Sequence, residues 1–284
     1  MERKMKKLIS IVVITMFSVL FFMGCGSNET NETNETSTPV EETTSEDEAE
    51  DAGEVTVRVF AAASMTEALG EIAELYIAEN PGVTIEFNFD SSGTLQTQIE
   101  NGAEADIFLS AATKQMTELA ENGYVNEATQ RDLLINKVVL IVPEDAETEM
   151  TSFEDVATDM LSLIALGNAD VPCGQYAQEI FTSLGVWEVV EAKASFGENV
   201  KAILSQVESG SVDAGVVYAT DAKTSTNGVR IVAESPQGSH SPVVYPAAVL
   251  SEAEDETAAI AFLEYLSSQA AVSVFERIGF TMAN

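Results

Sequence analysis

The chain has 284 residues, of which 47 are acidic and 13 basic, and its formal net charge is −34. So large an excess of negative charge repels a phosphate backbone and excludes nucleic acid as a partner. His240 is the single histidine, which argues against a histidine-based catalytic triad or a histidine metal cluster.

Residues 1–24 have the pattern of a signal peptide. Basic residues at positions 3, 4, 6 and 7 precede an apolar run from residue 8 to residue 23, which is short for a membrane span. The run ends at Gly24-Cys25, a pair that resembles a bacterial lipobox. The resemblance implies a lipid on Cys25 that anchors the chain at the extracellular face of the cell membrane, or its periplasmic side if the cell has an outer membrane. An ordinary secretory peptide and an uncleaved anchor are the alternatives.

Residues 25–53 are predicted to be a disordered acidic linker that starts at the lipidated Cys25. The segment contains three Asn-Glu-Thr repeats and then Glu, Asp, Thr and Ser, with almost no apolar residues. Such a composition cannot bury enough surface to offset the entropy of ordering. We expect a self-repelling stalk between the membrane and the folded domain.

The folded part is predicted to begin at residue 54 with alternating strands and helices. The hydrophobic pattern predicts strands over 55–60, 83–89 and 105–109. Each strand is followed by a predicted helix, and the three helical patterns cover 68–76, 94–100 and 113–121. This βαβαβα series indicates an α/β fold with a mostly parallel sheet flanked by helices.

A second α/β series follows and predicts a second lobe. Strands are expected over 137–142, 162–166, 192–196, 212–218, 229–232 and 243–250, and the last helices over 254–266 and 269–278. If the final strand and helices return to the first unit, lobe I comprises 54–138 plus 244–284, and lobe II comprises 139–243. Linkers near 137–142 and 240–249 would then form a two-strand hinge.

Small hydroxyl residues lie where two of these strands give way to helices. Ser64 and Glu67 have the spacing of a capping box, which places Ser64 at a helix N-terminus, and Asp90-Ser91-Ser92-Gly93-Thr94 repeats the arrangement. Ligands of parallel sheets bind at such junctions, and the helix dipole favours an anion there. The residues by themselves leave anion binding and simple helix capping both open.

Several motifs resemble those of the periplasmic molybdate-binding proteins of ABC transporters. They are VFAAASMT at 59–66, SSGTL at 91–95, QIE at 98–100, GAEADIF at 102–108, VPCGQYA at 171–177, ENV at 198–200, GVVYATDA at 215–222, YP at 245–246 and FERIGF at 275–280. They occur in order across residues 55–281. The resemblance implies a two-lobed, type II periplasmic-binding fold with a tetrahedral oxyanion in the cleft between the lobes.

The resemblance also implies which residues bind the oxyanion. Ser64 and Ser92 would donate from hydroxyl and backbone N–H groups, Cys173 and Val200 from backbone N–H groups, and Tyr218 from its hydroxyl. A fully ionised dianion only accepts hydrogen bonds, so this donor-only set is chemically consistent. The metal of the oxyanion is held through its oxygens, with no direct protein ligand and no cofactor. Cys173 and Gly93 replace residues that are commonly Ala and Ser in the family.

The implied function is to bind molybdate or tungstate as a monomer, by lobe closure, and deliver it to an ABC permease and its ATPase without converting it. A sulfate or other oxyanion carrier with the same fold is the first alternative. A surface hydrolase would need a base or metal near Ser64, and none is evident in the sequence. A ligand-free adhesin is a third possibility, which tight oxyanion binding would exclude.

Overall fold

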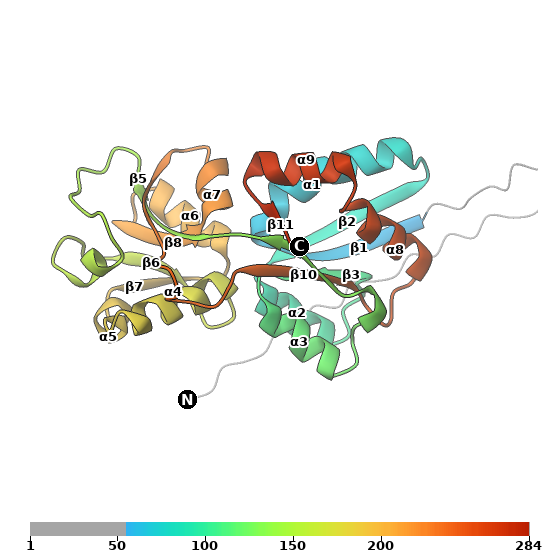
Figure 1. Ribbon diagram of the computed structural model, residues 1–284, viewed down its shortest axis with the longest axis horizontal. Helices are drawn as coiled ribbons and strands as arrows, with labels where there is room; N and C mark the ends of the chain where they lie inside the picture. Colours follow the sequence, from blue (N-terminus) through green and yellow to red (C-terminus); the bar gives the residue numbers. More distant parts are fainter. Residues whose placement is uncertain (1–54, 284) are drawn as a thin grey trace, which may run out of the picture. The chain divides into compact units, whose positions relative to one another are not determined.

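Two β-sheets, each covered by helices on both faces, form the part of the chain that the computed structural model describes, residues 55–283 (Figure 1). The predicted signal peptide (1–24), Cys25 and the whole linker to residue 53 lie outside the described residues. Within residues 55–283, no single helix is long and apolar enough to cross a bilayer. The helices α8 (Glu256–Tyr265) and α9 (Gln269–Ile278), bent by 59° at the break between them, pass that test only as a pair.

The first sheet has six strands in the order β11-β4-β10-β3-β1-β2. Strands β1, β2 and β3 are parallel to one another, whereas β10, β4 and β11 pair antiparallel. The bounds are β1 Val55–Ala62, β2 Val83–Asp90, β3 Ile107–Leu109, β4 Arg131–Ile135, β10 Val244–Val249 and β11 Thr281–Met282. We call this sheet and its helices lobe I.

The second sheet has five strands in the order β7-β6-β8-β5-β9. Here too three strands, β7, β6 and β8, are parallel, and β5 and β9 are antiparallel to their neighbours. The bounds are β5 Val138–Pro143, β6 Ile164–Gly167, β7 Ala194–Gly197, β8 Ala214–Tyr218 and β9 Val229–Glu234. We call this sheet and its helices lobe II.

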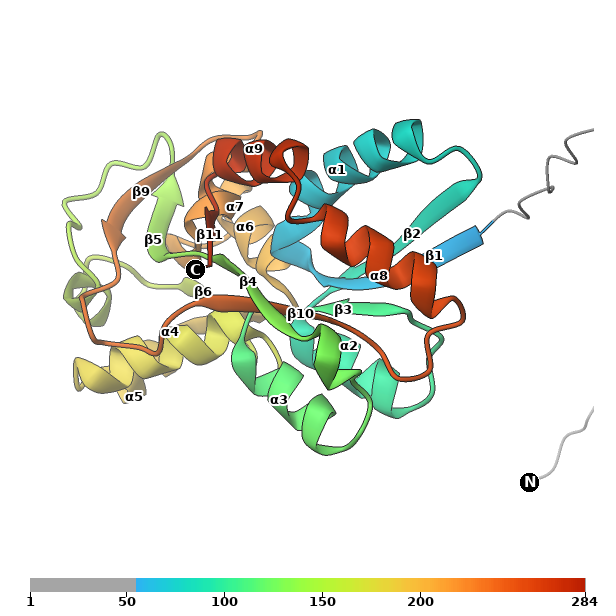
Figure 2. The ribbon, with the colours of Figure 1, turned by 45° about the vertical axis from the view of Figure 1, so that its right-hand side comes forward.

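Helices α1, α8 and α9 cover one face of the first sheet, and α2 and α3 cover the other (Figure 2). Their bounds are α1 Thr66–Glu79, α2 Ser92–Glu100, α3 Thr113–Glu121, α8 Glu256–Tyr265 and α9 Gln269–Ile278. Lobe II carries α4 Pro172–Ser183, α5 Trp187–Glu191, α6 Val200–Glu208 and α7 Ala219–Thr224. Three 3₁₀ turns complete the described elements: η1 Ala63–Met65, η2 Glu127–Thr129 and η3 Glu154–Ala157.

The chain passes between the two sheets twice, between β4 and β5 and between β9 and β10 (Figure 1). Near the first crossing, the Asn136 side chain donates to Thr220 Oγ1 of α7 at 2.9 Å and to Tyr245 Oη of β10 at 3.2 Å. One buried apolar cluster includes residues from both sheets, and a second, smaller cluster lies under α2 and α3. The first crossing is therefore held by hydrogen bonds to elements of both lobes.

The predicted two-lobed α/β fold is confirmed, with two refinements. Each sheet is mixed rather than mostly parallel, because the strands that return from the other lobe enter antiparallel. Strand β4, over Arg131–Ile135, was not predicted, since its only pairing partners are β10 and β11, more than 100 residues away. In a parallel core the carboxyl ends of the strands share an edge, and in both lobes that edge leads into the helix starts described next.

Candidate functional site

Four helical segments begin around one small cavity between the lobes. The turn η1 that leads into α1, and α2, come from lobe I, and α4 and α6 come from lobe II. The cavity is small, with about 10 Å³ open to the centre of a water-sized sphere. All five residues predicted to bind an oxyanion line it, together with seven others: Ala62, Ala63, Asp90, Ser91, Ala111, Val171 and Pro172.

Ser64 reaches the cavity from a 3₁₀ turn, and the predicted capping box is wrong. Helix α1 begins only at Thr66, and the Ser64 side chain caps no backbone N–H group. Its Oγ lies instead 2.9 Å from the hydroxyl of Tyr245, a buried residue of β10. Because Tyr245 Oη also accepts from Asn136, this chain of hydrogen bonds fixes the position of the Ser64 hydroxyl.

Ser91 and Ser92 have different roles at the start of α2. Ser91 is the N-cap, and its side chain accepts from Thr94 N–H at 3.2 Å. Ser92, the first helical residue, is fully buried, and its Oγ accepts a hydrogen bond from Ala111 N–H at 2.9 Å. With one lone pair taken in this way, the Ser92 hydroxyl proton can be donated to an acceptor in the cavity.

Lobe II contributes the first turns of α4 and α6. Pro172 begins α4, so Cys173 is the first residue of that helix with an N–H group. Asn199 caps α6 by accepting from Ala202 N–H at 3.0 Å, and Val200 is the first helical residue. The N–H groups of a first turn have no intrahelical partner and carry the positive end of the helix dipole, so both helices offer donors to an anion.

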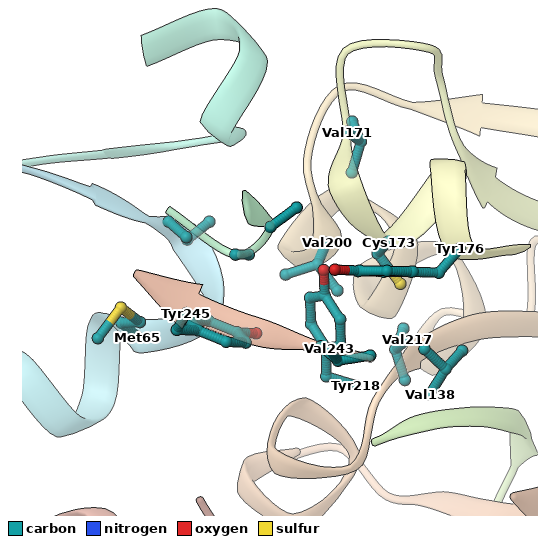
Figure 3. Packing of buried hydrophobic residues seen from close by; sticks show 14 of the residues in the cluster. Met65, Val138, Val171, Cys173, Tyr176, Val200, Val217, Tyr218, Val243 and Tyr245 are labelled. Atoms are coloured by element: carbon teal, nitrogen blue, oxygen red, sulfur yellow. The ribbon is translucent and has the colours of Figure 1, made fainter. Parts of the chain in front are cut away.

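Tyr218 ends strand β8 and closes the cavity. Its side chain is buried, and among the described residues its hydroxyl has no hydrogen-bond partner. Burial raises the pKa of Tyr218 well above its ordinary value, so the hydroxyl keeps its proton. Figure 3 shows this hydroxyl directed towards Cys173 and Val200. A buried donor without an acceptor is costly unless a ligand provides one.

The Cys173 thiol points into the protein rather than the cavity. Its Sγ–H donates to the carbonyl oxygen of Val216 in β8 at 3.4 Å, and the residue is 1% exposed. Burial raises the pKa of the thiol well above its usual value, so it stays protonated and unreactive. Cys173 therefore presents only its backbone to the cavity, as the resemblance implies.

Among residues 55–283, no lysine or arginine lines the cavity, and the one carboxylate that does is already hydrogen-bonded. Asp90 Oδ1 accepts from Ser91 N–H at 2.7 Å and from Asn199 Nδ2 at 3.1 Å. Lys201, the residue after Val200, pairs instead with Glu67 at 2.8 Å and with the buried Asp221 at 3.0 Å. Burial raises the pKa of Asp221 to about 6, and Lys201 limits the rise. An anion in this cavity would therefore be bound by neutral N–H and O–H dipoles and not by a basic side chain.

Residues 55–283 give no support for catalysis by His240, for a metal site or for a second anion site. His240 contacts Ser235 Oγ at 2.7 Å and the Ser241 carbonyl at 2.6 Å and does not line the cavity. No group of three His, Cys, Asp or Glu side chains in this range is arranged to hold a metal ion. A larger groove on lobe I is lined by several acidic residues, including Glu100, Glu104 and Glu252, which makes it unsuitable for an anion.

Sequence reasoning missed the residues that orient the donors. Tyr245 and Asn136 hold Ser64, Ala111 N–H occupies one lone pair of Ser92, and Asn199 caps α6. Only Asn199 had a local signal, an Asn directly before a helical pattern. The others come from residues distant along the chain.

Comparisons with known proteins show the family of the chain. A family model for bacterial extracellular solute-binding proteins matches residues 57–281. YvgL of Bacillus subtilis, named as a substrate-binding lipoprotein of an ABC transporter, is 39% identical over 98% of this chain and 99% of its own. Molybdate-binding protein ModA of Haemophilus influenzae is 40% identical over 81% of this chain and 91% of its own.

A solved structure shares the fold. The periplasmic molybdate-binding protein of Azotobacter vinelandii superposes with a TM-score of 0.72, at 22% identity, over 80% of this chain and 100% of that one. Together with the family match, this settles the class of protein. The chain belongs to the family of bacterial extracellular solute-binding proteins and is a binding protein of the ABC-transporter type, not an enzyme.

Proposed function

We propose that this protein binds molybdate, and tungstate with it, for an ABC importer. The observation that carries the proposal is the buried Tyr218 hydroxyl, which has no hydrogen-bond partner among residues 55–283 and lines a cavity at which four helical segments begin. A dianion that only accepts hydrogen bonds is the complement of such a donor set. The names of the relatives from H. influenzae and A. vinelandii support the choice of molybdate among tetrahedral oxyanions.

In the proposed complex each lobe supplies part of the hydrogen-bonding shell. Ser64 and Ser92 donate from hydroxyl and backbone N–H groups of lobe I, and Cys173 and Val200 donate from backbone N–H groups of lobe II. The Tyr218 hydroxyl completes the shell. Each hydrogen bond to a charged acceptor contributes about 1.5–3 kcal/mol, so a few of them give tight binding without any basic side chain.

Binding from both sides requires the lobes to close. We assign 54–137 plus 244–284 to lobe I and 138–243 to lobe II, because Val138 begins β5 of the second sheet. The two crossings near residues 137 and 243 would form the hinge. Two short crossing segments suit such a hinge, because a few residues at the ends of strands can absorb the rotation. Closure would bury the oxyanion and create the form that the permease recognises.

The remaining parts of the proposal concern location and assembly. A lipid on Cys25 would anchor the protein at the outer face of the cell membrane, and residues 25–53 would serve as its stalk. The name of the B. subtilis relative, a lipoprotein, supports this assignment. We propose a monomer that delivers its ligand to a permease driven by an ATPase.

Competition binding tests the choice of ligand. The purified full chain in detergent is titrated with molybdate, and the bound molybdate is then competed with tungstate and with sulfate. We expect tungstate to displace molybdate at comparable concentrations and sulfate only at a large excess. Displacement by sulfate at comparable concentrations would make the protein a sulfate carrier with the same fold.

A further inference from the structure

A chain of buried hydrogen bonds leads from the first crossing between the lobes to Ser64. Asn136 Nδ2 lies 3.2 Å from Tyr245 Oη, and Tyr245 Oη lies 2.9 Å from Ser64 Oγ. All three side chains are buried. Ser64 lines the cavity, whereas Asn136 and Tyr245 lie behind it and are not part of the lining. The chain therefore connects the cavity to residues outside it.

The backbone fixes the direction of the first hydrogen bond in this chain. Lys137 N–H lies 2.8 Å from Asn136 Oδ1, and a backbone N–H group can only donate. The oxygen of the Asn136 amide therefore faces Lys137, and its NH₂ group donates to Thr220 Oγ1 at 2.9 Å and to Tyr245 Oη. A flipped amide would place its NH₂ group against the Lys137 N–H group, donor against donor. Tyr245 Oη consequently accepts from Asn136.

The second hydrogen bond then has one favourable direction. Burial raises the pKa of Tyr245 well above its ordinary value, so the phenol keeps its proton. Among residues 55–283, the Tyr245 hydroxyl is hydrogen-bonded to Asn136 and Ser64 alone. If Ser64 donated to Tyr245, the Tyr245 proton would be buried without an acceptor, which is costly. Tyr245 therefore donates, Ser64 Oγ accepts, and the Ser64 proton is left for the cavity.

We infer that Asn136 and Tyr245 are positioning residues that make the Ser64 hydroxyl a hydrogen-bond donor to the oxyanion without touching it; this inference rests on the proposed function. A serine hydroxyl can donate or accept, and a fully ionised oxyanion only accepts. The direction set at Asn136 orients the Ser64 hydroxyl before the ligand arrives, so binding does not have to reorder it. Ala111 N–H has the same effect on the Ser92 hydroxyl, by a separate hydrogen bond.

Asn136→Asp reverses the chain and keeps its shape. The oxygen that replaces Nδ2 only accepts, so Tyr245 would donate to it, and Ser64 would donate to Tyr245 and present a lone pair to the oxyanion. Lys137 N–H and the hydroxyl groups of Thr220 and Tyr245 supply three donors to the new carboxylate. These donors favour its ionised form, and titrations at pH 8 favour it further.

Calorimetric titration of the full chain with molybdate compares Asn136→Asp in three backgrounds: wild type, Ser64→Ala and Ser92→Ala. The new carboxylate also repels the oxyanion directly, but this repulsion is common to all three backgrounds and cancels in the comparison. We expect the factor by which Asn136→Asp lowers affinity to be at least about ten times larger in the wild type than in Ser64→Ala, which has no hydroxyl to reverse. Ser92→Ala is the matched control, because it removes a hydroxyl outside the chain, and it should show the wild-type factor.

The hydroxyl proton of Tyr245 gives a second readout that requires no ligand. In NMR spectra of the ligand-free wild type, this proton should show a nuclear Overhauser cross-peak to the β-protons of Ser64. The cross-peak should be lost in Asn136→Asp, because the proton then points to the carboxylate. A change in stability alone would not move it.

The outcomes separate this inference from the proposed function. Equal factors in the wild-type and Ser64→Ala backgrounds would overturn the inference, and so would a Tyr245 hydroxyl proton directed away from Ser64 in the wild type. If the wild type binds no oxyanion, the proposed function fails, and the cross-peak alone decides the direction of the chain. The wild-type cross-peak also decides it if Asn136→Asp does not fold.

Discussion

Tyr218→Phe should raise stability and lower affinity at once. The substitution removes one buried hydroxyl and leaves the ring packed against Tyr176 and Tyr245, whose ring centroids lie 6.5 and 5.7 Å away. That hydroxyl has no hydrogen-bond partner among the described residues, and a buried polar group left without one costs about 1–3 kcal/mol. We therefore expect an increase in the free energy of unfolding of up to about that amount.

The same change removes one donor to the oxyanion. A hydrogen bond to a charged acceptor contributes about 1.5–3 kcal/mol, so the dissociation constant should rise roughly 10- to 150-fold. Denaturant unfolding without ligand and calorimetric titration with molybdate measure the two effects separately. Tyr245→Phe is the contrasting variant, because the Tyr245 hydroxyl is bonded to Ser64 and Asn136 and its loss should lower stability. A Tyr218→Phe protein that is less stable and binds as tightly as the wild type would refute the reasoning.

Three further predictions address other parts of the site. Ser64→Ala combined with Ser92→Ala removes two hydroxyl donors, so the affinity for molybdate should fall by roughly 10²- to 10⁴-fold. Circular dichroism should show an intact fold, and an unchanged affinity would mean that neither hydroxyl contacts the ligand. Cys173→Ala should keep wild-type affinity in calorimetry, because the thiol donates to a carbonyl group inside the protein; a tenfold loss would mean that the thiol contacts the ligand. Asp221 has a folded-state pKa of about 6, raised from an ordinary value of 3.8, so the folded protein binds its proton more tightly than the unfolded chain does. Urea unfolding measures the free energy of unfolding of the wild type and of Asp221→Asn between pH 4 and pH 7. The wild-type value relative to that of the variant should decrease as pH rises, by at most about 3 kcal/mol. An increase over that range would contradict the raised pKa.

The sequence predicts a residue well when its role follows from a local pattern. Cys173 and Val200 line the cavity because Pro172 and Asn199 start their helices there, and both signals lie next to the residue concerned. Tyr218 ends an apolar strand that pairs in parallel with β6, so it reaches the same edge of the sheet as the start of α4. The resemblance to the molybdate-binding family implied these three residues, and the helix starts and the strand end explain why they meet at the cavity.

Prediction fails where a distant residue decides the local structure. Ser64 and Glu67 have the spacing of a capping box, but the Ser64 hydroxyl is bonded to Tyr245, 181 residues away. Strand β4 is short and begins with Arg131 and Asp132, so its pattern is weak, and its pairing with β10 creates it. The contact between Gly93 and Asp170 likewise exists only when the two lobes meet.

The central claim is that neutral donors from both lobes hold a tetrahedral metal oxyanion. Calorimetric titration of the wild-type protein with molybdate, and then with tungstate and sulfate, tests it most directly. We predict tight one-to-one binding of molybdate and tungstate and much weaker binding of sulfate. Absence of binding by all three oxyanions would contradict the proposed site, however closely the fold matches that of its relatives.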